Sequence, residues 1–143
     1  MLSTHLEAIQ LIHVVPRWQA NRSQQQYLWR PMVVLDLDET LVCAYETSSL
    51  PAVVRNQAVE AGLECFDLEC VSVDKDCEGR QKVNHVTVFE RPGLHEFLQQ
   101  ISEFADLVLF TAGLEGYASP LIDRIDVENR FSLRLYRPAT VST

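Results

Sequence analysis

Apolar positions along the chain predict three short strands. The stretch Val33–Val42 reads VVLDLDETLV, and four of its first five residues are apolar. A run of this kind is typical of a strand that is buried inside a parallel sheet. Ala105–Phe110 is a second such run. A third strand is predicted where Phe131, Leu133 and Leu135 alternate with serine, arginine and tyrosine.

Helical spacing occurs between these strands. One predicted helix follows Arg91-Pro92-Gly93 and carries on one face Leu94, Phe97, Leu98 and Ile101. A second helix is predicted over Gly116–Ile125, with Pro120 in or near its first turn. Strands that alternate with helices are the pattern of an α/β fold with an open, mainly parallel, Rossmann-like sheet.

A β-hairpin is predicted between the first strand and the first helix, over about residues 65–90. Its extended segments are Cys65–Val73 and Lys82–Glu90, and the polar tip between them contains Gly79. We interpret this hairpin as a flap inserted into the α/β domain. The alternative is an ordinary β-meander that packs in the core. The connection before it, Thr47–Pro51, is rich in turn residues.

Residues 1–30 are interpreted as an N-terminal extension and linker, and residues 31–143 as the α/β domain. Apolar residues recur at helical spacing over Leu2–Ile12, so a short amphipathic helix is expected up to Pro16. The polar residues that end in Gln24–Gln26 indicate a linker. This division predicts one folded domain preceded by an appendage.

Composition narrows the classes of protein to which this chain can belong. The chain has 143 residues, a length typical of one domain, and its net charge of −8 argues against broad binding to nucleic acids or anionic membranes. No apolar stretch approaches the length of a membrane span. Reduced thiols in an intracellular protein are expected, because no CxxC pair occurs among the four cysteines Cys43, Cys65, Cys70 and Cys77.

Two carboxylates carry the candidate chemistry. Asp36 and Asp38 follow the first strand, and in an extended chain this spacing directs both side chains to one face. Fold stability does not account for them, because adjacent acids repel each other and resist desolvation. Mg²⁺ characteristically binds one or two carboxylates together with phosphate oxygens. Ligands of such sheets bind beyond the carboxyl ends of the strands, where Thr111 is also expected.

Asp36 and Asp38 together suit a reaction at a phosphate group. If Asp36 attacks a phosphate, an aspartyl-phosphate forms that water must later hydrolyse. Asp38 would protonate the leaving oxygen and then activate the water. A bound Mg²⁺ would screen Asp36 from the anionic phosphate and stabilise the charge that develops.

The motif Asp36-Leu37-Asp38-Glu39-Thr40 resembles the DxDxT signature of the haloacid-dehalogenase-like phosphohydrolases. Its longer form, DLDETLV, resembles the phosphatases that act on the C-terminal domain of RNA polymerase II, the small phosphatases of the NLI-interacting factor family. The resemblance implies that Asp36 is the nucleophile and a Mg²⁺ ligand. It implies that Asp38 is the general acid and base, with its backbone carbonyl on the metal. It also implies a flap at the predicted hairpin.

A second segment strengthens the resemblance. Leu109-Phe110-Thr111-Ala112-Gly113 resembles the second motif of the family, which implies that the Thr111 hydroxyl and the backbone N–H of Ala112 bind the phosphate. Gly113 stands where many members have serine. The alternative for Thr111 is a helix N-cap. Thr40 and Arg91 are expected to support the site, since Arg91-Pro92-Gly93-Leu94 also matches a family segment.

Two elements of the family are not matched. One is a lysine that neutralises the phosphate, and the other is an acidic pair that supplies a third protein contact to Mg²⁺. The sequence ends at Thr143, before either element, and its lysines, Lys75 and Lys82, lie in the predicted flap. We therefore expect a domain truncated at its C-terminus, with Val33–Leu37 left as an open apolar edge.

The resemblance implies a Mg²⁺-dependent phosphatase for phosphoserine or phosphothreonine in a protein, with the polymerase C-terminal domain as the substrate. It implies a nuclear location, with the cytoplasm as the alternative. A second hypothesis is a phosphopeptide-binding or scaffold protein without turnover. A third is the mitochondrial import subunit that resembles the same family; its support is a start that is poor in acids and contains arginine.

Overall fold

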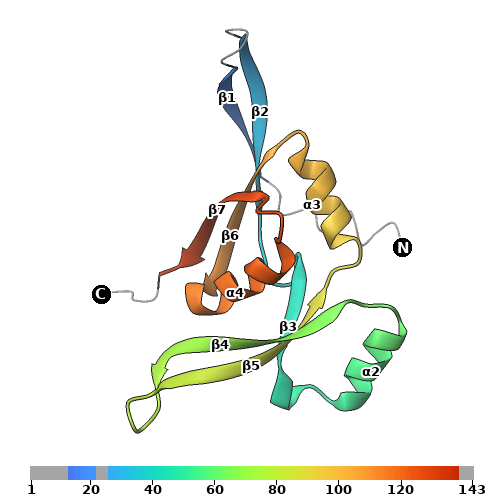
Figure 1. The fold of residues 1–143 in the computed structure, drawn as a ribbon, viewed down its shortest axis with the longest axis vertical. Helices are drawn as coiled ribbons and strands as arrows, with labels where there is room; N and C mark the ends of the chain where they lie inside the picture. Colours follow the sequence, from blue (N-terminus) through green and yellow to red (C-terminus); the bar gives the residue numbers. More distant parts are fainter. Residues whose placement is uncertain (1–12, 22–25, 139–143) are drawn as a thin grey trace.

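A computed structural model describes residues 13–21 and 26–138 (Figure 1). One sheet has four strands, in the order β1 (His13–Asn21), β2 (Gln26–Leu35), β6 (Asp106–Leu114) and β7 (Phe131–Arg137). β2, β6 and β7 are parallel, and β1 is antiparallel to β2. Between the strands lie α3 (Leu94–Ser102) and α4 (Glu115–Ile125), close to the predicted helices. The predicted α/β class with a mainly parallel sheet is confirmed.

The first strand differs from the prediction at its N-terminal side. β1 and the start of β2 occupy residues that were assigned to an extension and linker. β1 pairs with β2 as far as Val34, so the edge that was expected to be open is covered there. Pro16 suggested the end of a helix, but proline is also tolerated in an edge strand such as β1. The helix expected over Leu2–Ile12 lies outside the described residues.

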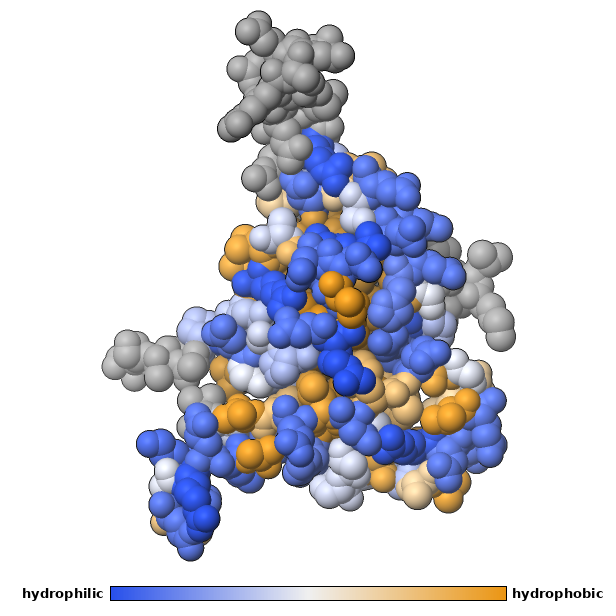
Figure 2. Space-filling model, in the orientation of Figure 1, coloured by the Kyte–Doolittle hydropathy of each residue, from blue (hydrophilic) through white to orange (hydrophobic). Residues whose placement is uncertain are grey.

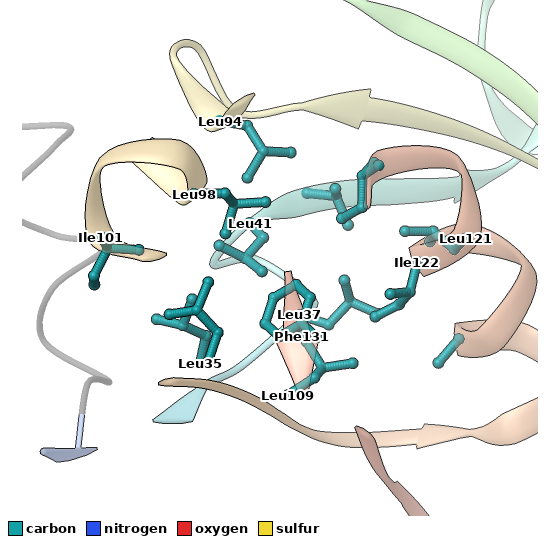
Figure 3. Close-up of a cluster of buried hydrophobic side chains, with 14 of the residues drawn as sticks. Leu35, Leu37, Leu41, Leu94, Leu98, Ile101, Leu109, Leu121, Ile122 and Phe131 are labelled. Atoms are coloured by element: carbon teal, nitrogen blue, oxygen red, sulfur yellow. The ribbon is translucent and has the colours of Figure 1, made fainter. Parts of the chain in front are cut away.

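The core forms on the face of the sheet that carries Val33, Leu35, Leu107 and Leu109. Successive side chains of a strand point to opposite faces, so these residues lie on the same side of β2 and β6. The apolar stripes of both helices join them, as Figure 3 shows for Leu98 and Leu121. The helical spacing in the sequence therefore identifies the buried face of α3 correctly, whereas for α4 the sequence predicted a helix without assigning its buried face.

A second, three-stranded sheet stands beside the first, and we call it the flap sheet. Its order is β3 (Val42–Glu46), β5 (Gln81–Glu90) and β4 (Cys65–Lys75), all antiparallel. The predicted hairpin is β4 and β5, and it extends away from the domain at its tip (Figure 1). Part of the hairpin is buried, as the alternative β-meander would be, because the side chains of Cys70 and Val88 are almost inaccessible to solvent.

The segment between the first strand and the hairpin is more structured than predicted. It contains β3, the 3₁₀ turn η1 (Thr47–Ser49) and α2 (Ala52–Glu60). α2 has no buried residue, so it lacks the apolar stripe by which a helix is recognised in a sequence. Among the described residues, no helix has the length and apolarity to cross a membrane.

The end of the second predicted strand and the position of Pro120 in its helix are corrected. β6 continues through Thr111, Ala112 and Gly113 to Leu114, whereas the sequence placed its end before Thr111. The register with β7 shifts between Phe110 and Leu114, so this extension is irregular. Pro120 lies inside α4, beyond its first turn.

Candidate active site

The two aspartates begin a tight turn that follows β2, and we call Asp36–Val42 the acidic loop. Leu37 is completely buried between them and anchors the turn. Its carbonyl accepts hydrogen bonds from the N–H groups of Leu41 and Val42, at 2.9 and 3.2 Å. Asp36 and Asp38 flank Leu37, and the charge of Asp36 raises the pKa of Asp38, so the two carboxylates lie near each other.

Thr40 and Arg91 hold the acidic loop in place. Thr40 is buried, and its hydroxyl lies 3.5 Å from an Asp36 carboxylate oxygen, a long hydrogen bond. Arg91 donates from its guanidinium to the Thr40 carbonyl at 3.0 Å and from its backbone N–H to the Leu41 carbonyl at 3.0 Å. The sequence assigned both residues a supporting role, and their contacts are with the loop.

Tyr117, in the first turns of α4, contacts the second aspartate. Its hydroxyl donates to an Asp38 carboxylate oxygen at 2.6 Å. Burial and then this bond raise the pKa of Tyr117 far above its usual value, so the hydroxyl keeps its proton. Burial raises the pKa of Asp38; the bond from Tyr117 lowers it in part, and the charges of Asp36 and Glu39 raise it. The sequence analysis gave this tyrosine no role.

The end of β6 lies at the same edge of the sheet. Leu35 pairs with Leu109 in parallel, so Asp36, which follows β2, and Thr111, in the last part of β6, lie toward the same edge of the sheet. Thr111 is only 3% exposed, and its hydroxyl oxygen accepts the N–H of Gly113 at 3.0 Å. The hydroxyl can still donate its own proton.

The alternative role of Thr111 as a helix cap is wrong. The N-cap of α4 is Leu114, and no side chain caps it.

The structure also accounts for Gly113, the departure from the family pattern. A Cβ atom at this position would lie 3.1 Å from the Tyr117 ring and 3.3 Å from the Thr111 hydroxyl. Glycine therefore leaves room for the tyrosine that contacts Asp38.

The oxygen atoms of the acidic loop could supply some, and not all, of the ligands of a Mg²⁺ ion. Within the described residues, no cluster of three or more acidic, histidine or cysteine side chains is suited to a metal, and no ion pair is formed by Asp36 or Asp38. Mg²⁺ often retains waters and binds through one or two carboxylates and the substrate phosphate. Asp36 and the backbone carbonyl of Asp38 are the groups that would hold it.

Other charged residues lie elsewhere. Lys75 and Lys82 are in the outer part of the β4–β5 hairpin, as the sequence predicted. Asp126 is buried at the end of α4, where it accepts the backbone N–H groups of Arg130 and Phe131 at 2.8 and 3.1 Å. This aspartate organises the entry into β7, so it is not a substitute for a missing metal ligand.

Comparisons with known proteins give the family. Residues 31–143 match the family described as NLI interacting factor-like phosphatase. The chain is 36% identical over 112 residues to Phosphatase Herzog of Drosophila melanogaster, covering 78% of this chain and 26% of that protein. It is 37% identical over 109 residues to the human carboxy-terminal domain RNA polymerase II polypeptide A small phosphatase 1, covering 76% of this chain and 34% of that protein.

A solved structure agrees with these relatives. The fission yeast RNA polymerase II CTD phosphatase Fcp1, bound to beryllium fluoride, superimposes with a TM-score of 0.57 at 25% identity. The alignment covers 76% of this chain and 30% of that one. The chain thus spans about a third or less of the length of these three proteins. By the match over residues 31–143, this chain belongs to the NLI interacting factor-like phosphatase family.

Proposed function

We propose that this chain carries the nucleophile and the general acid of a protein phosphatase that hydrolyses phosphoserine or phosphothreonine. The observation that supports this most is the pair Asp36 and Asp38, which lie near each other in the acidic loop, toward the same sheet edge as Thr111. The two carboxylates differ in environment, because Asp38 is bound by a half-buried tyrosine and Asp36 is not. Groups with different environments suit different roles in one reaction.

The first step is a displacement at phosphorus. An Asp36 carboxylate oxygen attacks the phosphorus, the bond to the serine or threonine oxygen breaks, and an aspartyl-phosphate forms. Asp38, in its protonated form, gives its proton to the leaving oxygen. Thr111, through its hydroxyl, and Ala112, through its backbone N–H, donate to the phosphate oxygens as charge develops there.

The second step releases phosphate. Asp38, now ionised, takes a proton from a water molecule as that water attacks the phosphorus. The bond between the phosphorus and the Asp36 oxygen breaks, and both carboxyl groups return to their starting forms. Asp36 and the backbone carbonyl of Asp38 would hold Mg²⁺, which would supply charge neutralisation for the phosphate.

The substrate and location follow from the relatives by analogy. We infer a phosphorylated protein, with the C-terminal domain of RNA polymerase II as the first candidate, because that domain appears in the names of the human relative and of the solved structure. A nuclear location would accompany that substrate. Cytoplasmic and mitochondrial locations are the alternatives, and fractionation of cells that express the chain distinguishes them.

The test is hydrolysis of p-nitrophenyl phosphate and of a phosphoserine peptide by the purified chain, with Mg²⁺ and with a chelator. Activity is expected only with Mg²⁺, and Asp36→Asn is expected to reduce it by at least about a thousandfold, because the covalent step is lost. Circular dichroism must show that both proteins are folded. A folded wild-type chain that releases no phosphate contradicts the proposal.

A second candidate is phosphopeptide binding without turnover. It is favoured by the position of both lysines in the outer hairpin, which leaves the acidic loop without a lysine in the described part of the chain. A phosphopeptide that binds the folded wild-type chain and remains phosphorylated would support this candidate over the enzyme.

A further inference from the structure

A groove separates α2 from the flap sheet, next to the acidic loop. Its volume is about 890 Å³, within the range of small-ligand and peptide pockets. Its apolar lining consists of Tyr45, Leu50, Val54, Ala58, Leu63 and Phe89. We call this feature the α2 groove. The rings of Tyr45 and Phe89 meet edge to face, with centroids 6.0 Å apart, and form one wall.

α2 borders the groove and does not fill it. None of its residues is buried, and Val53 and Val54 are 66% and 48% exposed. In Figure 2, hydrophobic and hydrophilic side chains alternate over this region, at the lower right. The helix is tied to the flap sheet by a polar contact, in which Arg55 donates to Asp67 at 2.9 Å. Apolar side chains are therefore left without the packing that usually holds a helix in place.

The groove borders the acidic loop. Thr40 and Arg91 line it, and both hold the acidic loop through the contacts described above. Cys43 also lines the groove, and the pKa of its thiol is raised by burial and then by the charge of Glu39. A chain that enters the groove therefore passes beside the loop that carries Asp36.

The mouth of the groove carries negative charge. Glu39 is exposed, has a positive φ of 59°, and forms no ion pair with any residue in the described part of the chain. The other lining carboxylate, Glu90, is mostly buried and lies 2.7 Å from His95. Glu39 is thus the carboxylate of the groove that is available to a ligand cation.

We propose that the α2 groove binds the segment of the phosphoprotein next to the phosphorylated residue. An apolar side chain of that segment enters between α2 and the Tyr45–Phe89 wall, and a lysine or arginine faces Glu39. The inference rests on the proposed function for the position of the phosphate. The proposal adds a specificity site on the α2 side of the flap sheet. A phosphoprotein segment is the expected occupant because the groove is apolar, carries a negative charge at its mouth and borders the acidic loop.

The test uses fluorescent phosphoserine peptides that contain one lysine and carry a single leucine at different positions, with a peptide that has serine in place of leucine. Binding is measured by anisotropy on the Asp36→Asn background, where the phosphate stays on. At one position, leucine is expected to strengthen binding about fivefold over serine, because about half of its apolar area leaves water. Glu39→Gln is expected to weaken binding of the lysine peptide and not of an alanine version.

The matched variants are Val54→Asn and Val53→Asn. Both change a valine in the first turn of α2, but only Val54 lines the groove. Val54→Asn is expected to abolish the preference for leucine, and Val53→Asn to keep it. In the enzyme with Asp36 intact, kcat/KM for the leucine peptide should fall with Val54→Asn, and hydrolysis of p-nitrophenyl phosphate should not change.

Each other outcome has a definite meaning. Equal binding of the leucine and serine peptides at every position, or equal effects of the two valine variants, overturns the groove as a peptide site. If the folded chain prefers the leucine peptide but hydrolyses neither substrate, the groove is supported as a peptide site and the proposed phosphatase activity is contradicted. If sedimentation velocity finds a dimer that only Val54→Asn dissociates, a second copy occupies the groove and the proposal is wrong.

Discussion

Single side chains give Asp36 and Asp38 different surroundings, which suit different catalytic roles. Leu37, between them, is buried in the core. Tyr117 then donates to Asp38 alone, and Gly113 leaves space for its ring. An acid with a raised pKa beside an ordinary carboxylate suits a proton donor beside a nucleophile. Tyr117 is therefore a positioning residue for Asp38.

Tyr117→Phe tests this role. The variant keeps the ring and removes the hydroxyl, and a hydrogen bond to a charged group is worth about 1.5–3 kcal/mol. We expect kcat to fall between about tenfold and about a hundredfold, with little change in KM. Tyr136→Phe is the control, because Tyr136 lies on β7 and its side chain is hydrogen-bonded to Arg134. Equal losses in the two variants would show that Tyr117 acts only through general packing.

Asp38→Asn tests the pKa of Asp38 through stability. Burial raises the folded-state pKa above the unfolded value, so ionised Asp38 destabilises the fold at neutral pH. Below the unfolded pKa the carboxyl is protonated in both states, and the effect vanishes. Without Mg²⁺, we expect the Asn variant to have the higher Tm at neutral pH, by a margin that shrinks on acidification. A margin that is constant with pH contradicts the raised pKa.

Helices and strands position these side chains through close backbone contacts. α4 carries Tyr117 and packs against β4 of the flap sheet. A Cβ atom on Gly116 would lie 2.6 Å from the Val71 carbonyl oxygen, so glycine permits this approach. The buried thiol of Cys70, also on β4, is 3.9 Å from the Tyr117 carbonyl. The flap sheet and the candidate active site are therefore coupled through one turn of α4.

Gly116→Ala tests this coupling. The added methyl group must displace either α4 or β4, and overpacking of this kind costs about 1–3 kcal/mol. We expect the free energy of unfolding, measured in urea, to fall by that amount. Glu115→Ala, in the same turn, is expected to change it by less than about 0.5 kcal/mol. If the alanine variant is as stable as the wild type, the contact between α4 and β4 is looser than the structure has it.

The acidic loop is the junction of the two sheets. β2 ends at Leu35 and β3 begins at Val42, so the loop links the mainly parallel sheet to the flap sheet. A ligand that neutralises the carboxylates of the loop stabilises the folded state of both, because binding free energy adds to folding free energy. The loop is thus the place where Mg²⁺ should affect the stability of the chain.

Addition of Mg²⁺ tests this link. At a hundred times its dissociation constant, a ligand that binds only the folded state stabilises it by about 2.7 kcal/mol. We expect a rise in Tm of several degrees with Mg²⁺, measured against the same ionic strength of NaCl. Asp36→Asn should abolish the rise, and Glu128→Gln should keep it. An equal rise in all three proteins would indicate nonspecific ion binding.

Much of the fold was predictable, because local periodicity reports burial. The strands around Val33 and Leu107 and the helix with Leu98 were found from apolar spacing, and each spacing corresponds to a buried face. α2 was missed because it buries nothing, and a pattern of burial cannot reveal it. β1 was missed because an edge strand can contain proline and polar residues.

The candidate site divides in the same way. The proximity of Asp36 and Asp38 follows from their spacing, so it was contained in the order of the residues. The bond from Tyr117 to Asp38 joins residues 79 positions apart, and no local pattern carries that information. It depends on where α4 packs against the flap sheet and on the space left by Gly113 and Gly116. Short-range stereochemistry set the motif, and long-range packing assigned the two acids their different surroundings.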